Sequence, residues 1–267
     1  MTIGYAIETQ NLTRKFKDRT VVDNLNISIS QGIIYGLLGP NGAGKSTTIK
    51  MLTTLLEPTS GRALVAGSDI ENESMEVRKS IGYVPQLVSS DGSLSADENL
   101  MLSAKLYRIP RAERKPRIDE ALSFMGLTEV RNKMVKTFSG GMIRRLELAQ
   151  AMLHRPSVLF LDEPTIGLDP VARRVVWEKL KELRSKFNMT ILITTHDMEE
   201  ADVLCDQLGI LHKGVIAGSG NPEDLKNQVG PHATLDDVFI HFSGATISEG
   251  GNFGDVRQTR RTANRLG

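Results

Sequence analysis

The chain has 267 residues, 40% of them hydrophobic and 24% charged, an ordinary composition for a globular protein with a substantial core. Its formal net charge is +1 at pH 7, so the chain as a whole carries no field that would attract nucleic acid or an anionic membrane. The one cysteine, Cys205, excludes an internal disulfide and fits a reducing cytoplasm. Because Val203 and Leu204 precede it, we expect this thiol to be a small core side chain rather than a nucleophile.

No transmembrane segment or signal peptide is predicted. The longest apolar stretches, such as residues 33–38 and 158–161, are far shorter than the roughly 18–20 residues that cross a bilayer. The N-terminal residues do not show a basic region followed by an apolar run, so we expect no signal peptide. If the protein drives membrane transport, another chain must therefore supply the pore.

The first part of the chain is typical of half-exposed antiparallel strands. Apolar and polar residues alternate in segments 6–9 and 26–29, as in strands that have one face in solvent. Residues 62–67 are predicted to join the same sheet.

Four near-continuous apolar runs predict parallel strands that are covered on both faces. They are residues 33–38, 81–84, 158–161 and 190–194. Polar or glycine residues follow closely after each run, in order Gly39, Gln86, Asp162 with Glu163, and His196. Ligands in open α/β sheets bind at the carboxyl ends of the strands. The sequence therefore predicts a site at one edge of this sheet.

The pattern becomes helical between the second and the third of these strands. The predicted helices are residues 97–106, 117–125 and 142–153, within a helical lobe of about residues 88–157. The signals weaken after about residue 220, and residues 248–254, which are rich in glycine and polar side chains, are expected to be flexible. We therefore divide the chain into a main domain, residues 1–225, and a C-terminal extension, residues 226–267.

The segment after the first apolar run fits the pattern G-x-x-x-x-G-K-[ST], which is typical of a phosphate-binding loop. Its glycines let backbone N–H groups surround phosphates, Lys45 brings positive charge, and Ser46 offers a hydroxyl to Mg²⁺. A helix predicted over residues 47–56 would direct the positive end of its dipole at the anion. A glycine turn is the alternative, but the flanking strand and helix favour the phosphate loop. The residues assigned to the nucleotide here are Gly39, Pro40, Asn41, Gly42, Ala43, Gly44, Lys45, Ser46 and Thr47.

Two adjacent carboxylates follow the third apolar run. A phosphoryl-transfer site needs an acid near the metal, and Asp162 is the candidate. Hydrolysis also needs a group that orients or deprotonates water, and Glu163 is the adjacent choice. Alone, the pair would more commonly be a strand end with solvated acids, but the phosphate loop upstream favours the catalytic interpretation.

Gln86 and His196 follow two further strands. An amide can contact Mg²⁺ or the attacking water, and an imidazole can hydrogen-bond a γ-phosphate oxygen. Their position beside the other strand ends favours a role in the same site. Four other histidines are interpreted as ordinary residues, namely His154, His212, His232 and His241.

The segment Phe138-Ser139-Gly140-Gly141-Met142 resembles the signature sequence of ATP-binding cassette (ABC) ATPases. It stands about 20 residues before Asp162, as in that family. The chain is identified as a member of the family on seven elements in the expected order between residues 16 and 196. They are the aromatic Phe16, the phosphate loop, Gln86, the signature, Asp162-Glu163, Gly167-Leu168-Asp169 and His196. The resemblance implies an α/β fold with a RecA-like P-loop NTPase core, an antiparallel β lobe and an inserted α-helical lobe.

The resemblance also implies a role for each matched residue of the core. Phe16 would stack on adenine, and the metal site would comprise Ser46, Gln86 and Asp162. Glu163 would be the general base. The catalytic set would be Glu163, His196, Gln86 and Lys45, and the cofactors would be ATP and Mg²⁺.

The signature would act on a second copy of the chain. Ser139 offers a hydroxyl, Gly140 and Gly141 expose backbone N–H groups, and a helix begins there, so the segment is a second anion site. A glycine-rich helix start is the alternative interpretation. By resemblance, Ser139, Gly140 and Gly141 would reach ATP bound to the partner of a head-to-tail dimer, and Asp169 would lie at the seam.

Two departures from the common family pattern indicate the branch. Phe138 and Met142 replace the usual Leu and Gln of the signature, and Gly167 stands where Ala is more common. These variants, the pair Arg144-Arg145 and residues 235–240 resemble the ABC-2 exporter branch, especially its drug-resistance ATPases. The basic residues at 257–265 are interpreted as a solvated end, with docking to a membrane partner or acidic lipid as the alternative.

The sequence therefore predicts the ATPase subunit of an ABC-2-type exporter of drugs, lipids or other hydrophobic compounds. A separate transmembrane permease would dock on the helical lobe beside Gln86, which places the chain on the cytoplasmic face of the cell membrane. The first alternative is a soluble ABC ATPase that acts on nucleic acid or ribosomes. One cassette, no heptad tract and near-zero net charge disfavour it, and no nucleic-acid partner is expected. A nucleotide-binding regulator without turnover is disfavoured by the intact Glu163 and His196.

Overall fold

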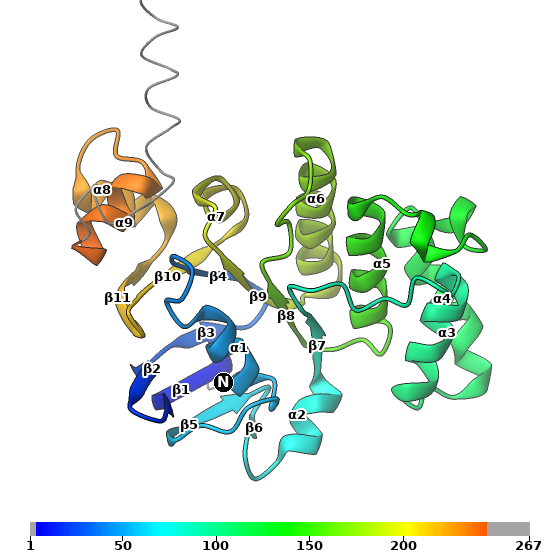
Figure 1. Ribbon diagram of the computed structural model, residues 1–267, viewed down its shortest axis with the longest axis horizontal. Helices are drawn as coiled ribbons and strands as arrows, with labels where there is room; N and C mark the ends of the chain where they lie inside the picture. Colours follow the sequence, from blue (N-terminus) through cyan, green and yellow to red (C-terminus); the bar gives the residue numbers. More distant parts are fainter. Residues whose placement is uncertain (1–3, 245–267) are drawn as a thin grey trace, which may run out of the picture.

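The computed structural model describes residues 4–244 (Figure 1). The segments 248–254 and 257–265 discussed above lie outside this range. Among residues 4–244, none of the helices combines the length and the apolarity needed to cross a lipid bilayer.

The central sheet has six strands in the order β11-β10-β4-β9-β8-β7, and the five from β10 to β7 are parallel. The structure confirms the four predicted parallel strands and adds β10, with β11 antiparallel at the edge. The strands are β4 (Ile34–Leu38), β7 (Ile81–Val84), β8 (Val158–Asp162), β9 (Thr190–Thr195), β10 (Gln207–His212) and β11 (Val215–Gly220).

The second sheet is antiparallel, with the order β2-β1-β5-β6 and β3 also paired to β1. Its strands are β1 (Tyr5–Phe16), β2 (Arg19–Leu25), β3 (Ser28–Ser30), β5 (Ser60–Val65) and β6 (Ser68–Asp69). The sequence did not predict β2 or the full length of β1. The turn between them is Lys17-Asp18, and Lys17 adopts a positive φ of 50°. Such a charged turn lacks the glycine or asparagine that usually predicts a hairpin.

The helical lobe contains α3 (Ala96–Leu106), α4 (Arg111–Phe124) and α5 (Gly140–Met152), with short 3₁₀ turns η1 (Thr128–Val130) and η2 (Val135–Thr137). Ser95 and Glu98 form a capping box that starts α3. The predicted start of the middle helix, after Pro116, is wrong because α4 begins at Arg111 and contains that proline. The proline has no N–H to donate to the carbonyl of Ala112, four residues earlier. Both residues are exposed, so water can bond that carbonyl.

The remaining helices cover the central sheet and its edge. They are α1 (Lys45–Leu52), α2 (Ser74–Ser80), α6 (Pro170–Phe187), α7 (Met198–Leu204), α8 (Pro222–Val229) and α9 (Leu235–Ser243). In Figure 1, α8 and α9 lie together beside β11 and β10. Although the sequence signals are weak there, Leu225, Leu235 and Val238 are buried in the main core. The division of the chain at residue 225, which lies inside α8, remains a prediction.

Both faces of the central sheet are covered, which explains its near-continuous apolar strands. In β4, Ile34 and Leu38 belong to one buried cluster, whereas Tyr35 and Leu37 belong to the cluster on the other face. Cys205 is buried in the first cluster, as expected for a core side chain, and burial raises the pKa of its thiol.

Candidate active site

The phosphate loop joins the end of β4 to the start of α1 at Lys45. Glycine is required at Gly44, which has a φ of +111° and whose added Cβ would lie 2.7 Å from the Val21 carbonyl oxygen. An added Cβ on Gly39 would collide with the Leu211 carbonyl oxygen. The loop therefore packs its backbone directly against β2 and β10, and this close packing fixes its shape.

Lys45 is held across the loop that precedes it. Its side chain is 4% exposed, and its ammonium donates hydrogen bonds to the carbonyl oxygens of Gly39, at 2.7 Å, and Pro40, at 3.1 Å. The same nitrogen lies 3.3 Å from Oε1 of Glu163. Burial lowers the pKa of this ammonium, and the attraction of the Glu163 carboxylate opposes that shift. A positive charge is thus fixed beside Gly39 and Pro40, the first two residues of the loop.

Ser46, Asp162 and Thr194 form a connected group of oxygen atoms on α1, β8 and β9. The hydroxyl of Ser46 donates to Oδ1 of Asp162 at 3.0 Å, and the hydroxyl of Thr194 donates to the same oxygen at 2.6 Å. A hydroxyl and a carboxylate suit Mg²⁺, which in phosphate sites takes one or two protein oxygens together with substrate phosphates. The donor set therefore fits the metal that the sequence analysis predicts.

Glu163 contacts three other predicted catalytic side chains. Its Oε1 lies 3.3 Å from the Lys45 ammonium and 3.2 Å from Nδ1 of His196. Its Oε2 accepts a hydrogen bond from the Gln86 amide at 3.3 Å. Residues from α1 and from the ends of β7, β8 and β9 thus meet at one carboxylate, which is 7% exposed.

The backbone of Glu163 contributes to this convergence. Its φ of +49° is unusual for a residue other than glycine, and its N–H donates to both the carbonyl and the hydroxyl oxygen of Thr194, at 3.1 and 3.0 Å. Left-handed backbone of this kind often marks a functional position. Here it turns the chain at the end of β8 and directs the carboxylate toward Lys45.

A cavity of about 320 Å³ lies beside Glu163 and Lys45. Its volume is in the range of small-molecule sites, and backbone amides, hydroxyls and one ammonium surround it, as a polyphosphate requires. Its lining residues are Val21, Asn41, Gly42, Gly44, Lys45, Ser46, Thr47, Gln86 and Glu163.

His196 is not among the lining residues but contacts Glu163, whereas Phe16, Ser139 and Asp169 are neither lining residues nor bonded to Glu163. Phe16, at the end of β1, is 43% exposed, and the Arg14 guanidinium lies 4.5 Å from its ring centroid. Ser139 is the exposed N-cap of α5, and its hydroxyl accepts the Met142 N–H at 3.3 Å. Asp169 is the N-cap of α6 and accepts the N–H groups of two residues in the first turn.

The two signature glycines have a packing role within the chain. A Cβ on Gly141 would lie 2.7 Å from Cβ of Ala172 in α6, and a Cβ on Gly140 would lie 3.2 Å from Leu168. The signature therefore packs against the segment that contains Asp169, at the N-termini of α5 and α6. No residue of this segment lines the cavity beside Lys45.

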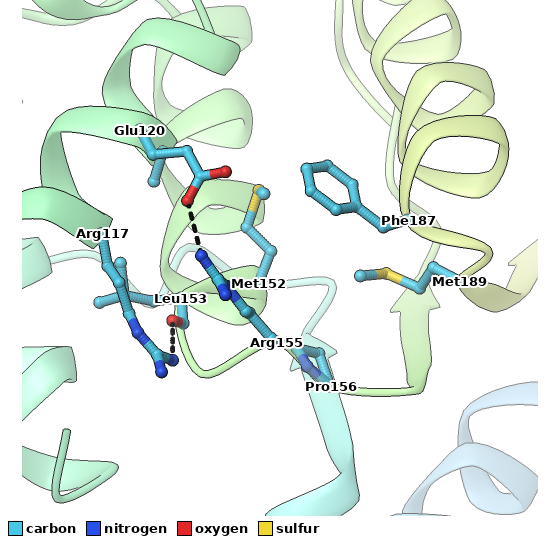
Figure 2. Close-up of a pocket in the computed structure, with 9 residues that line it drawn as sticks. Arg117, Glu120, Met152, Leu153, Arg155, Pro156, Phe187 and Met189 are labelled. Carbon is cyan, nitrogen blue, oxygen red and sulfur yellow. Dashed lines mark hydrogen bonds and ion pairs between the residues drawn. The ribbon is translucent and has the colours of Figure 1, made fainter. Parts of the chain in front are cut away.

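A second cavity, of about 200 Å³, lies between α4, the end of α5 and the end of α6. Figure 2 shows the residues that line it. Its charged residues are already bonded. Arg155 donates to Glu120 at 3.1 Å, and Arg117 donates to the Leu153 carbonyl at 3.3 Å and to Glu113 at 2.6 Å. Met152, Phe187 and Met189 form much of its apolar wall. This cavity holds none of the predicted site residues.

Thr194 was not predicted as a site residue, although it bonds the Asp162 carboxylate and the Glu163 N–H at the end of β8. The only signal was a pair of threonines at the end of an otherwise apolar strand. Glu200 was not predicted either; it is 1% exposed and accepts from Thr165 at 2.6 Å and from Trp177 at 3.0 Å. Burial raises the pKa of this carboxyl, and the hydrogen bonds it accepts oppose the shift. Glu200 thereby ties the segment after Glu163 to α6 and α7.

Comparison with known proteins identifies the family. Residues 22–166, more than half of the chain, match the family model described as ABC transporter. The chain belongs to the ABC transporter family. It is a P-loop ATPase of that family, and its α/β fold is that of ABC ATP-binding subunits.

Relatives of this ABC ATPase include ATP-binding proteins of drug resistance. It is 40% identical over 243 residues to the linearmycin resistance ATP-binding protein LnrL of Bacillus subtilis (strain 168). The match covers 91% of this chain and 76% of LnrL. It is 41% identical over 225 residues to the daunorubicin/doxorubicin resistance ATP-binding protein DrrA of Streptomyces peucetius, covering 84% of this chain and 68% of DrrA.

A solved structure of the ATP-binding subunit of an ABC transporter matches the fold with a TM-score of 0.79 and 30% identity. The match covers 89% of this chain and 99% of that chain. These similarities give no support to the alternative of an ABC ATPase that acts on nucleic acid or ribosomes.

Proposed function

We propose that this ABC ATPase powers an ABC-2-type exporter of drugs, lipids or other hydrophobic compounds through a separate membrane permease. The observation that carries the proposal is the convergence of Lys45, Gln86 and His196 on Glu163 beside the phosphate loop. The export direction and the substrate class are supported by the similarity to LnrL and DrrA, two resistance proteins.

Each residue of the site has its own proposed role in ATP hydrolysis. Lys45 and the loop amides bind and neutralise the phosphates of ATP, and Glu163 orients and deprotonates the attacking water. Gln86 and His196 hold the Glu163 carboxylate in place and contact the reacting groups. Ser46 and Asp162 would hold Mg²⁺, which supplies additional positive charge at the phosphates. Phe16 would stack on the adenine of the nucleotide.

The permease is proposed to dock on an apolar surface next to Gln86. Leu87 and Val88, which directly follow Gln86, are 81% and 61% exposed, and Leu106 of α3 is 73% exposed. The loop and α3 are close, because Gln150 bonds both Ser90, at 2.7 Å, and Ser103, at 3.1 Å. Exposed apolar groups beside an active site are typical of a protein interface. Docking there would place the chain on the cytoplasmic face of the membrane.

We expect single cysteines in place of Leu87 or Leu106 to crosslink to the permease in membranes that contain the assembled transporter. The native thiol of Cys205 is buried and its pKa is raised, so it competes little for the reagent. A cysteine in place of Met75, which is 58% exposed on α2, is the matched control and should not crosslink. Crosslinks that formed only from residues 257–265 would contradict this docking surface.

The second proposed partner is another copy of the chain, in a head-to-tail dimer with ATP between the two copies. Lys45 and Glu163 line one cavity, whereas Ser139 is exposed at a separate helix N-terminus. Two apolar residues beside Asp169, Ile166 and Val171, are 44% and 74% exposed, as an interface there would require. A closed two-fold dimer would bring the signature of each copy to the phosphate loop of the other.

We expect Lys45→Ala and Ser139→Arg homodimers to be inactive separately and their mixture to recover part of the hydrolysis. In the mixed dimer one site combines an intact phosphate loop with an intact signature, and the other site carries both lesions. Phosphate release across mixing ratios, with the permease present, measures the recovery. Normal hydrolysis by Ser139→Arg alone would show that the signature contributes nothing to the site.

A further inference from the structure

The loop that follows β7 is fastened to α5 by three side chains on one face of that helix. Arg144 donates to the carbonyl oxygens of Pro85, at 2.9 Å, and Gln86, at 3.2 Å. One turn later, Glu147 accepts the N–H and the hydroxyl of Ser89, at 2.6 and 3.0 Å. After another turn, Gln150 accepts the hydroxyl of Ser90 at 2.7 Å. In the first part of this loop, residues 85–90, every residue except Leu87 and Val88 is thus hydrogen-bonded to one helix.

Arg144 and Glu147 are a buried ion pair, with side chains 7% and 1% exposed and a separation of 3.0 Å. Removing two charges from water is unfavourable unless their remaining hydrogen-bonding capacity is satisfied. Here the loop backbone satisfies it, through the carbonyls of Pro85 and Gln86 and the N–H of Ser89. Desolvation lowers the pKa of the Arg144 guanidinium, and Glu147 opposes that shift. The pair and the loop backbone therefore hold one another in place.

The same backbone carries the Gln86 side chain. Its amide reaches Oε2 of Glu163 at 3.3 Å from beyond the end of β7, which stops at Val84. In the part of the chain that the structure describes, the carbonyl of Gln86 is bonded by Arg144, so this guanidinium sets the position of the residue. Because the hydrogen bond between the Gln86 amide and the Glu163 carboxylate is already 3.3 Å long, a small shift of the loop would break it.

We propose that Arg144 and Glu147 are positioning residues for ATP hydrolysis, which hold residues 85–89 on α5 so that Gln86 reaches Glu163. The helix that carries the pair begins at Gly140, directly after Ser139. Gln86 and the signature are therefore attached to the same helix. This inference rests on the proposed role of Gln86 in the site.

The test is a kinetic cycle on the full chain, with the permease present if free turnover is too slow to measure. In Arg144→Met/Glu147→Leu both buried charges are replaced by apolar side chains, which is often close to neutral for stability. We expect the turnover number to fall about 10- to 100-fold, as for a small misplacement of a catalytic group, with the KM for ATP unchanged. Thermal unfolding of the variant checks that the fold is retained.

The decisive comparison adds Gln86→Ala to this variant. If the pair acts through Gln86, the triple variant is slower than the more impaired parent by no more than about twofold, because coupled residues are not additive. Multiplied effects would overturn the proposal, and so would normal turnover of Arg144→Met/Glu147→Leu. Normal turnover of Gln86→Ala alone would instead refute the role of Gln86, and the inference with it.

Two further variants separate positioning from general stability. Arg155 lies three residues after the end of α5, and its guanidinium bonds Glu120, at 3.1 Å, rather than the loop. Arg155→Met is therefore the control and should leave the turnover number within about twofold. Arg144→Lys keeps the charge beside Glu147 but cannot bond both carbonyls with one planar group, so it should lose turnover severalfold. Wild-type turnover in Arg144→Lys at wild-type KM would contradict the proposal.

Discussion

Replacing Glu163 by Gln is expected to leave ATP binding intact and to slow hydrolysis by about 10²–10⁴-fold, the usual contribution of a positioned general base. The amide has nearly the same shape as the carboxylate, so Lys45 and the loop amides can still bind the phosphates. It cannot accept the proton of the attacking water. The backbone bonds from the N–H of Glu163 to Thr194 do not depend on the side chain, so the turn after β8 is preserved.

Two measurements check this expectation. Titration with a fluorescent ATP analogue should give the wild-type dissociation constant, and phosphate release should fall to near the background rate. An ATP-bound dimer should also accumulate, which size-exclusion chromatography detects. Glu199→Gln removes an exposed carboxylate from the first turn of α7 and should behave as wild type. Near-normal turnover of Glu163→Gln would exclude Glu163 as the base.

Lys45→Ala is expected to weaken the binding of Mg-ATP by roughly 100-fold, since charged hydrogen bonds contribute about 1.5–3 kcal/mol each and 1.4 kcal/mol is tenfold in affinity. The ammonium is fixed by Gly39, Pro40 and Glu163, so it needs little reorganisation to meet the phosphates. Its loss also leaves the buried Glu163 carboxylate without its cation, which adds repulsion toward an anionic ligand.

The same titration measures the loss, and circular dichroism verifies that the variant is folded. Lys50→Ala is the matched control, because Lys50 lies on the same helix with its side chain exposed. It should bind ATP normally. An unchanged dissociation constant for Lys45→Ala would refute the assignment of residues 39–46 as the phosphate loop.

The sequence predicts the central sheet well because its strands are buried on both faces. Such strands appear as continuous apolar runs, and their polar ends mark the edge where Gln86, Asp162, Glu163 and His196 lie. The helices α8 and α9 were harder to predict. They are short, and their buried residues Leu225, Leu235 and Val238 are separated by exposed ones, so the apolar signal is weak without the tertiary contacts.

Contacts between distant parts of the chain explain most of what the sequence could not predict about the site. In the sequence, Arg144 is one of two neighbouring arginines in a predicted helix. In the structure it donates hydrogen bonds to the carbonyls of Pro85 and Gln86, which lie 59 and 58 residues earlier. Thr194 reads as an ordinary strand residue, yet it bonds Asp162 on the adjacent strand. Neither role has a local pattern, because each depends on which elements the fold brings together.

The burial of Leu225, Leu235 and Val238 in the main core has a consequence for local unfolding. Helix α9 packs on β10, and α8 packs on α9 and β11. The end of β10 presents the Leu211 carbonyl against which Gly39 of the phosphate loop packs. Opening of these helices would expose apolar core and loosen that packing. Because a ligand that binds only the closed form suppresses such opening, ATP should slow amide hydrogen exchange in α8 and α9, far along the chain from the residues that bind it.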